Sequence, residues 1–318
     1  MKHLLFIDPL EKLTVKKDST LLLAHSLKQA GKEVYLLFEK DFYFSNSGLM
    51  SFEVYDFESI LDSEEMALKS FQLTKNHQTR LDSRATIHMR LDPPFDTRYL
   101  RYLWMLKGLE EKYEVKVVNS PAGIMLHNEK LEAYLQKGAV SSFIGSGLEE
   151  FRRYIDTLRK KGITEVIIKP LDLYQGIGVN KLSLEDKLKL DTHFHDKTVE
   201  YKGPLVVQPF IPEVAEGEIR SIYFKGEELG TILKIPKEGN FLSNIAQGAR
   251  FQKHELNSKQ RTACEKVSKQ MSKHGVDWIA FDILGDYIQE INITCPGLLN
   301  EVSKAEKLNL AERIIQLL

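Results

Sequence analysis

The sequence predicts an α/β protein whose first domain has a Rossmann-like arrangement. Strand-like apolar runs alternate with helical segments along the N-terminal third of the chain, which is the order of a β-α-β unit. From about residue 128 the organisation changes to extended segments joined by loops that contain glycine or proline. With 318 residues, the chain is long enough for more than one packed unit. We therefore expect a first domain at residues 1–121 and a second at 122–318.

The first domain should begin with a strand at residues 4–7, a helix that Gly31 ends, and a second strand at 34–38. Asp18 or Ser19 can cap this helix, because either side chain can accept a hydrogen bond from the backbone of the first turn. No GxGxxG motif follows the first strand, so a dinucleotide site is not expected here.

A third strand at residues 85–90 runs into a loop whose two consecutive prolines prevent further strand pairing. The loop would lie at the C-terminal end of a parallel strand, where open α/β sheets bind their ligands. Arg90 is therefore a candidate anion donor, and an ordinary surface arginine is the alternative. A helix at 98–107 and a strand at 115–118 complete the predicted domain.

In the second domain, Lys169 stands near the end of a predicted strand at 166–170 and precedes a loop that contains Gly176. A fixed ammonium beside backbone N–H groups suits a phosphate, although glycines in such loops more often serve the turn itself. The P-loop motif GxxxxGK[ST] does not occur. Helices are expected from residue 128 and at 149–160.

Two polar stretches follow. Residues 181–189 are expected to form a solvent-facing helix or loop. Residues 193–196 carry two histidines that could chelate a metal, but a solvated loop is the better interpretation.

An apolar run at residues 205–212 contains Gln208, Phe210 and Ile211. A chain that passes between two lobes can offer free backbone groups to a purine edge, and the nearby carboxylate of Glu218 could accept hydrogen bonds from ribose hydroxyls. A central strand followed by a hairpin is the plain alternative.

A polar loop at residues 239–250 precedes a predicted helix at 258–273. The loop contains Asn244, Gln247, Gly248 and Arg250.

Residues 281–294 predict two short strands joined by a tight turn at a Gly-Asp pair, because apolar and polar residues alternate on both sides of it. Alternation places Glu290 and Asn292 on one face, and pairing of the strands can bring Asp282 onto that face. Two carboxylates and an amide oxygen form a hard, oxygen-only ligand set that suits Mg²⁺ bridging phosphates. A sheet with one solvated polar face is the alternative.

Composition excludes several classes of protein. The chain is 42% hydrophobic and 28% charged, and its 44 basic and 45 acidic residues give a net charge of −1, which provides no general attraction to nucleic acid or anionic lipid. The N-terminus does not predict a signal peptide, and no apolar run approaches the roughly 18 residues of a membrane span. Cys264 and Cys295 lack metal-ligand spacing and suit a reducing compartment. We expect a cytoplasmic protein.

An ordered set of segments resembles prokaryotic-type glutathione synthetase, a ligase of the ATP-grasp superfamily. The segments are IDPLEKLTVKKDST, MRLDPPFDT, VVNSPAGIMLHNEK, IIKPLDLYQGIGV, VVQPFIP with EGEIR, NIAQGAR, and FDILGDYIQEINIT. The resemblance extends from Phe6 to about Glu306. It implies a Rossmann-like N-terminal domain followed by a two-lobed ATP-grasp domain that clamps ATP between two sheets, with lobes at about 122–205 and 206–318.

The resemblance also implies a reaction. ATP would phosphorylate the C-terminal carboxylate of γ-glutamylcysteine with the help of Mg²⁺, or of Mn²⁺ in its place, and the amine of glycine would displace phosphate. An acyl-phosphate route needs cations around the moving phosphoryl group but no side-chain nucleophile. The expected partners are these small molecules or their analogues, with no nucleic acid and no membrane, and the protein is expected to be a homo-oligomer.

Roles for individual residues follow from the matching motifs. The residues matched to the nucleotide site are Lys130, Lys169, Gly176, Gln208, Phe210, Ile211, Glu218 and Arg220. The residues matched to the metal are Asp282, Glu290 and Asn292. The residues assigned to the dipeptide substrate are Asp18, Ser19 and Arg90, and those assigned to catalysis are Lys234, Asn244 and Arg250.

The chain departs from the family pattern at several positions. Lys234 and Leu242 stand where the family usually has arginine, residues 173–175 replace small residues, and 295–297 replace a Ser-Pro-Thr-like stretch. Lysine keeps the charge but loses the bidentate geometry of arginine, whereas leucine loses the charge. These changes leave open a ligase for another acid and amine, or a nucleotide-binding protein with reduced catalysis.

Overall fold

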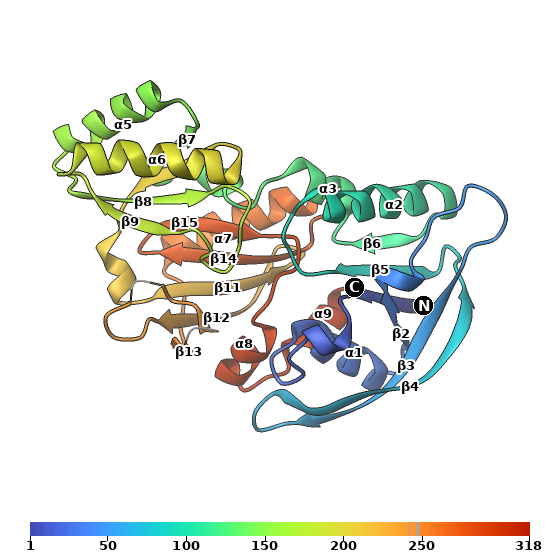
Figure 1. Ribbon diagram of the computed structural model, residues 1–318. Helices are drawn as coiled ribbons and strands as arrows, with labels where there is room; N and C mark the ends of the chain where they lie inside the picture. The colour runs from blue at the N-terminus through green and yellow to red at the C-terminus, as the bar shows by residue number, and fades with distance from the viewer. Residues whose placement is uncertain (241, 246–247) are drawn as a thin grey trace.

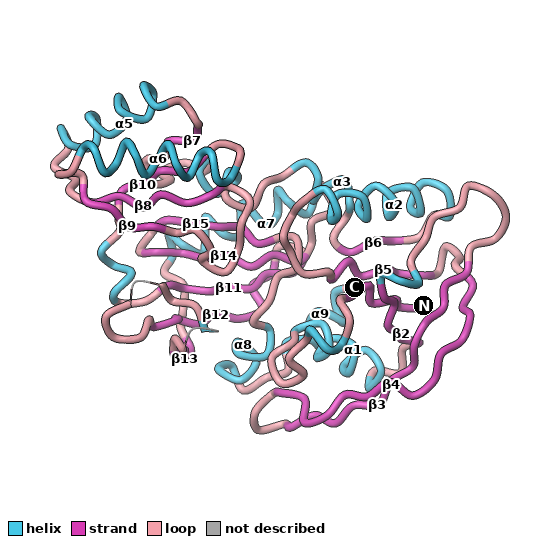
Figure 2. Tube along the Cα trace, in the orientation of Figure 1, coloured by secondary structure: helices cyan, strands magenta, loops and turns pink. Residues whose placement is uncertain are grey.

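The computed structural model describes residues 1–240, 242–245 and 248–318, and this part of the chain contains three β-sheets with helices on their faces (Figure 1). A six-stranded sheet comes first, followed by a four-stranded and a five-stranded sheet. The four-stranded sheet lies above the five-stranded one, and the six-stranded sheet lies beside them (Figure 2). The predicted α/β class and the order of the domains are confirmed.

The six-stranded sheet has the order β4-β3-β2-β1-β5-β6. Its strands are β1 (Lys2–Ile7), β2 (Glu33–Phe38), β3 (Ser51–Asp62), β4 (Ala67–Arg80), β5 (Ala85–Arg90) and β6 (Lys116–Val118). Strand β1 pairs in parallel with β2 and β5, and β5 pairs in parallel with β6. The parallel strands β2, β1, β5 and β6, with their connecting helices, form the predicted Rossmann-like arrangement.

The helices of this domain are α1 (Ser19–Gln29), α2 (Thr97–Tyr113) and α3 (Pro121–Leu126), with 3₁₀ turns η1 (Leu10–Lys12) and η2 (Glu39–Asp41). Asp18 is the residue that caps α1, because its Oδ1 accepts hydrogen bonds from the backbone N–H groups of Thr20 at 2.9 Å and Leu21 at 2.8 Å. Gly31, at φ +70°, follows the end of the helix.

Sequence analysis assigned no element to the long hairpin of β3 and β4. These strands pair antiparallel and extend the sheet beyond β2 through a single bridge between Leu36 and Tyr55. Two register shifts interrupt the regular alternation of β3, and much of β4 is exposed. An irregular, half-solvated ribbon of this kind carries only a weak sequence pattern.

The four-stranded sheet has the order β7-β10-β8-β9. Its strands are β7 (Phe143–Gly145), β8 (Glu165–Pro170), β9 (Asn180–Ser183) and β10 (Leu205–Pro209), and its helices are α5 (Leu148–Lys160) and α6 (Lys187–Tyr201). Because all of β10 belongs to this sheet, the change to the next sheet comes after Pro209 and not at residue 205.

Helix α6 corrects the expectation of a solvated loop at residues 193–196. The rings of Phe194 in α6 and Phe151 in α5 stack at 4.1 Å between centroids, and both side chains are fully buried. Because the residues next to Phe194 in the sequence are polar, the sequence pattern did not indicate that this apolar side chain packs in a core. Residues 181–183 likewise belong to strand β9.

The five-stranded antiparallel sheet has the order β13-β12-β11-β14-β15. Its strands are β11 (Glu218–Phe224), β12 (Glu227–Ile235), β13 (Arg250–Lys253), β14 (Trp278–Leu284) and β15 (Tyr287–Asn292). The helices α4 (Leu131–Tyr134) and α7 (Ser258–Ser272) belong to this part, and η3 (Pro212–Ala215) precedes β11. The predicted hairpin is confirmed, since β14 and β15 pair around a turn in which Gly285 has φ +56°.

The last helices, α8 (Leu299–Glu306) and α9 (Leu310–Leu317), return to the first domain. One apolar cluster contains Leu22 and Leu27 of α1, Phe224 of β11, and Leu310 and Ile314 of α9. The six-stranded and five-stranded sheets therefore share a core, although they belong to different sequence domains. None of the helices in the described residues has the length and apolar character needed to cross a membrane.

Candidate functional site

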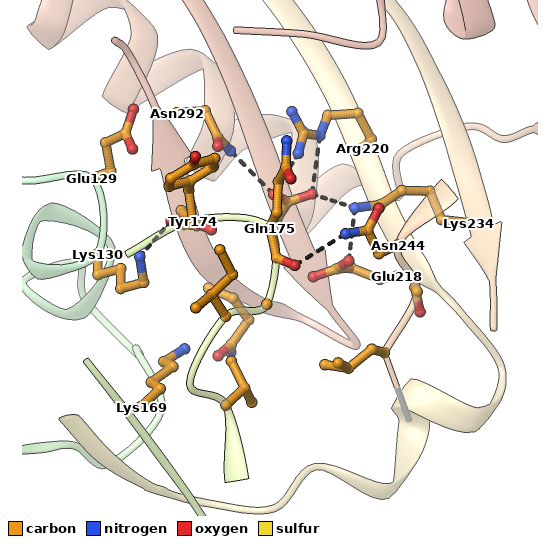
Figure 3. Close-up of a pocket in the computed structure, with 18 of the residues that line it drawn as sticks. Glu129, Lys130, Lys169, Tyr174, Gln175, Glu218, Arg220, Lys234, Asn244 and Asn292 are labelled. Carbon is orange, nitrogen blue, oxygen red and sulfur yellow. Dashed lines mark hydrogen bonds and ion pairs between the residues drawn. The ribbon is translucent and has the colours of Figure 1, made fainter. Parts of the chain in front are cut away.

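A cavity of about 440 Å³ lies between the four-stranded and five-stranded sheets. Strands β8 and β10 line one side, and β11, β12, β14 and β15 line the other. Lys17, Asp92 and Pro93 of the first domain also reach it. Figure 3 shows Lys130 and Lys169 at one side of this space and Arg220, Lys234 and Glu218 at the opposite side.

Asp282 is the centre of a charged network on the five-stranded sheet. Arg220 donates from Nε at 3.0 Å and from Nη2 at 2.7 Å to the two oxygens of this carboxylate, and Lys234 Nζ lies 2.7 Å from Oδ1. Burial alone would raise the pKa of Asp282, but the two cations outweigh burial and lower it to about 2. Asp282 is therefore ionised at neutral pH.

Lys234 connects this network to Glu218. Its Nζ also lies 2.7 Å from Oε2 of Glu218, because the two residues stand opposite each other in the β11–β12 pairing. Burial raises the pKa of Glu218, and the ammonium of Lys234 acts in the opposite direction. The lysine thus holds together the predicted ribose-binding acid and a predicted metal ligand.

Lys130 pairs with Glu290, the second predicted metal ligand. Lys130 Nζ lies 2.8 Å from Glu290 Oε1 and donates to the backbone carbonyl of Leu173 at 2.5 Å. Burial would lower the pKa of Lys130, yet the carboxylate of Glu290 raises it above the ordinary value. The predicted helix from residue 128 is only the single turn α4, and Lys130 occupies its N-terminal end.

Lys169 differs from Lys130 and Lys234, which form ion pairs in the cavity. Its ammonium makes no hydrogen bond or ion pair in the described part of the chain, and it lies 5.6 Å from the ring centroid of Tyr134. Burial, together with the charge of Lys130, lowers the pKa of Lys169 to about 8. A desolvated cation without a counter-ion attracts an anionic ligand such as a phosphate.

The predicted metal ligands do lie together on the hairpin. Asp282 stands opposite Glu290 in the β14–β15 pairing, and the Asn292 amide donates to Asp282 Oδ2 at 3.1 Å. The described residues contain no group of three histidine, cysteine or acidic side chains that could hold a metal. Two carboxylates and one amide oxygen nevertheless fit a hard divalent ion, provided that Lys130, Lys234 and Arg220 give up part of their contacts.

Two loops meet over the cavity. Asn244 Nδ2 donates to the backbone carbonyl of Gln175 at 3.0 Å. A Cβ added to Gly176 would lie 3.4 Å from Leu242 Cδ1, and Gly176 has φ +77°, a conformation that favours glycine. Leu242 therefore supplies an apolar contact between the loops at the position where the family has a charged residue.

Arg250 is not brought to the cavity. It begins the edge strand β13, pairs with Ile235, and is exposed outside the lining residues. Strand pairing carries it away from the loop in which sequence analysis placed it. Gln247 lies outside the described residues.

Gln208, Phe210 and Ile211 all line the cavity, as predicted for the segment between the lobes. Gln208 is buried, and its Nε2 donates to Ser142 Oγ at 2.8 Å. The backbone N–H of Phe210 already donates to the carbonyl of Glu165 at 2.9 Å. A purine would therefore contact other backbone groups of this segment and not the N–H of Phe210.

The three residues predicted to bind the dipeptide do not line the cavity. Arg90 is buried beneath it, where Nε donates to Thr20 Oγ1 at 2.9 Å and Nη2 to the Pro296 carbonyl at 2.8 Å. Asp18 caps α1, and Ser19 Oγ accepts from the backbone N–H of Leu299 at 3.0 Å. Ser19 joins α1 to α8, Arg90 joins α1 to the segment before α8, and Asp18 caps α1. Their substrate role stays a prediction.

Sequence analysis missed Glu129 and Glu301, both of which line the cavity. Glu129 Oε1 accepts hydrogen bonds from the backbone N–H groups of Ile293 at 2.7 Å and Thr294 at 2.9 Å, which fixes the chain next to Lys130. An acidic residue beside a short helix gave no signal for this contact, because its partners are more than 160 residues away.

Comparison with known proteins agrees with this geometry. The N-terminal domain of prokaryotic glutathione synthetase matches residues 1–125, and the ATP-grasp domain of prokaryotic glutathione synthetase matches residues 135–307. Glutathione synthetase of Coxiella burnetii is 29% identical over 314 residues, which cover 98% of this chain and 94% of that protein. Glutathione synthetase of Prochlorococcus marinus is 27% identical over 321 residues, which cover 99% of this chain and 98% of that protein.

Among solved structures, that of D-cycloserine synthetase has the same fold, with a TM-score of 0.65, 12% identity and 99% of both chains covered. Two facing sheets around a lysine-lined and acid-lined cavity, together with these matches, define an ATP-dependent ligase of the ATP-grasp class. More narrowly, the chain belongs to the prokaryotic glutathione synthetase family. Membership in this family implies the use of ATP and dependence on a divalent metal.

Proposed function

We propose that this enzyme makes glutathione from γ-glutamylcysteine and glycine, with conversion of ATP to ADP and phosphate. The observation that carries the proposal is that Lys169, whose ammonium makes no hydrogen bond or ion pair among the described residues, lines the same cavity as the acids Asp282 and Glu290. Figure 3 shows Lys130 and Lys169 on one side of this space and Arg220 and Lys234 on the other. Cations together with oxygen ligands around one cavity suit the transfer of a phosphoryl group to a carboxylate. The family match over both domains supports the choice of substrates.

In this proposal Lys169 binds the terminal phosphates of ATP, since its ammonium has no other partner among the described residues. Lys130 would transfer from Glu290 and the Leu173 carbonyl to a phosphate oxygen. Glu218 would exchange its contact with Lys234 for the ribose hydroxyls, which leaves Lys234 and Arg220 to stabilise charge on the phosphoryl group. Gln208, Phe210 and Ile211 would surround the base.

Asp282, Glu290 and Asn292 would hold Mg²⁺, with Mn²⁺ as a substitute, and the ion would neutralise phosphate charge when bound. The donor set fits because it offers only oxygen ligands from one face of the hairpin. With a cation held by these acids, Lys130, Lys234 and Arg220, which contact them in this structure, would be available to phosphate oxygens. Nucleotide and metal should therefore bind together.

A second candidate is an ATP-grasp ligase that joins another acid and amine. Leu242 favours it, because it places an apolar contact where the family usually has arginine in the loop over the site. A nucleotide-binding protein with reduced catalysis is a weaker candidate, since the lysines and the proposed metal ligands are all present in the cavity. A cytoplasmic location and a homo-oligomeric state are also expectations of this proposal.

A phosphate-release screen separates these candidates. Purified enzyme with ATP and Mg²⁺ should release phosphate with γ-glutamylcysteine plus glycine and not with either one alone. Release with a different acid and amine pair only would establish the second candidate, and no release with any pair would favour the third. Formation of AMP and pyrophosphate would contradict the acyl-phosphate route.

A further inference from the structure

One acid of the cavity has no role in the proposed reaction and, among the described residues, no partner for one of its buried carboxylate oxygens. The carboxylates that line the cavity are Asp92, Glu129, Glu218, Asp282, Glu290 and Glu301. Glu218, Asp282 and Glu290 are paired with lysine or arginine, and Glu129 accepts backbone hydrogen bonds. Asp92 is exposed, so water satisfies its carboxylate.

Glu301 is the exception. Only 7% of its surface is exposed, and its Oε2 has no hydrogen-bond partner among the described residues. Burial of a carboxylate without a partner destabilises the protein. Such an arrangement suggests that a ligand supplies the partner in the working enzyme.

The surroundings of Glu301 indicate the kind of ligand. Glu301 lies in the first turn of α8, which the Leu299 N–H to Ser19 Oγ hydrogen bond and the Asn300 Nδ2 to Lys16 carbonyl contact hold against the start of α1. The next residue after Lys16 is Lys17, which also lines the cavity and makes no ion pair or hydrogen bond through its side chain in the described part of the chain.

Among the described residues, the end of the cavity next to the first domain therefore presents one carboxylate oxygen without a hydrogen-bond partner, Oε2 of Glu301, and one ammonium without a hydrogen bond or ion pair, that of Lys17. An amino acid at neutral pH is a zwitterion, with a charge of each sign separated by one carbon atom. Glu301 matches its ammonium group and Lys17 matches its carboxylate.

We propose that Glu301 and Lys17 form the binding subsite for the amine substrate, and that this substrate is a free amino acid. The inference rests on the proposed ligase function and extends it to named residues. The location is consistent, because Glu301 and Lys17 line the same cavity as Asp282 and its partner Arg220. The acid substrate would occupy the remaining space.

The test uses two reactions of the intact enzyme. Exchange of ¹⁸O between bridge and non-bridge positions of ATP, driven by γ-glutamylcysteine alone, reports acyl-phosphate formation and needs no amine. Amide formation needs both γ-glutamylcysteine and the amine. Glu301→Gln should leave the exchange rate within twofold of wild type and raise the KM for glycine at least tenfold, with the KM for γ-glutamylcysteine unchanged. Glu306→Gln, on the same helix but outside the cavity, is the matched control.

Lys17 is tested with a pair of amines. Lys17→Met should raise the KM for glycine at least tenfold but leave the KM for glycinamide, which has no carboxylate, within twofold. Glu301→Gln should raise both values. Lys16→Met is the control, because Lys16 does not line the cavity.

The outcomes are distinct. The subsite would be overturned if Glu301→Gln left the KM for glycine unchanged. It would also be overturned if this variant raised the KM for γ-glutamylcysteine instead of the KM for glycine. Equal loss of isotope exchange and amide formation would overturn it as well, because Glu301 would then act on ATP or the acid. Absence of exchange and of amide formation in the wild-type enzyme would instead refute the proposed function, and the subsite with it.

Discussion

At the scale of single residues, the ammonium of Lys169 illustrates how the cavity adjusts side-chain chemistry. Burial and the charge of Lys130 lower its pKa to about 8, below the value near 10.4 of an exposed lysine. Bound phosphates would reverse the effect, because an anion stabilises the protonated form. The charge of Lys169 therefore changes with pH within the range in which the enzyme can be studied without ATP.

ATP affinity should consequently weaken as pH rises above about 8. Below that pH Lys169 is protonated and can bind phosphate, whereas above it binding must first take up a proton. Calorimetric titration with ATP from pH 7 to 9.5 should show a rising Kd and net proton uptake. Lys169→Arg should remove this dependence, since guanidinium remains charged. The same pH dependence in that variant would show that another group is responsible.

Glu290 contacts Lys130 in the ligand-free structure and is a proposed metal ligand. Glu290→Gln should lower Mg²⁺-dependent turnover by about 100-fold or more, comparable to loss of one transition-state contact, while a neutral acceptor remains for Lys130. Glu290→Ala would also leave a buried lysine without its partner, at a cost of about 3 kcal/mol. Turnover across a Mg²⁺ titration and thermal unfolding are the measurements, with the exposed Glu265→Gln on α7 as control. Near-normal turnover would refute the metal-site assignment.

At the scale of elements, two loops meet over the cavity, one at residues 171–179 and one that includes residues 242–245. The Asn244 to Gln175 hydrogen bond and the packing of Leu242 beside Gly176 join them in the ligand-free structure. The edge strand β13 takes the end of the second loop away from the site. Catalytic charge on this side should therefore come from Lys234 and Arg220, which belong to β12 and β11.

Arg250→Ala should have little effect on the reaction. Arg250 is exposed on β13 and does not line the cavity, so turnover and ATP affinity should both stay within about twofold of wild type, as for an ordinary surface substitution. Steady-state kinetics and nucleotide titration measure the two quantities separately. A large fall in turnover at unchanged ATP affinity would mean that the loop moves Arg250 onto the transition state during catalysis.

At the scale of the whole molecule, the first domain and the five-stranded sheet are held together by one core. Helix α9, at the end of the chain, packs on α1 near its beginning within the cluster that includes Leu22, Phe224 and Leu310. The contacts that hold α8 to α1 also position Glu301 and Lys17 at the cavity. Stability of the domain interface and geometry of the site therefore depend on the same packing.

Leu310→Ala should destabilise the molecule as a unit. Removal of this fully buried side chain should cost about 3 kcal/mol, including the cavity that it leaves. Chemical denaturation followed by near-UV and far-UV circular dichroism should show coincident transitions, shifted to lower denaturant than in wild type. Separate transitions for the two probes would contradict a shared core.

Local pattern in the sequence was sufficient for much of the fold and for part of the site. Alternation and turn residues predicted the β14–β15 hairpin with Asp282, Glu290 and Asn292 on it, and the strand that carries Lys169, because these signals arise from neighbours in the chain. The motifs then identified the family, since they extend over both domains.

Only the tertiary structure decided which charges meet. The contacts of Asp282 with Lys234 and Arg220, and those of Arg90, depend on segments distant in sequence. So do the exposure of Arg250 and the lack of a hydrogen-bond partner for Glu301 Oε2 among the described residues. An ion pair or a desolvated carboxylate is created by packing, and a residue's own neighbours do not encode it. Local pattern therefore predicted most of the elements and the chemical groups that they carry, but not the irregular β3–β4 hairpin or the polar helix α6. Three-dimensional packing determined which side chains already have partners and which remain to bind a ligand.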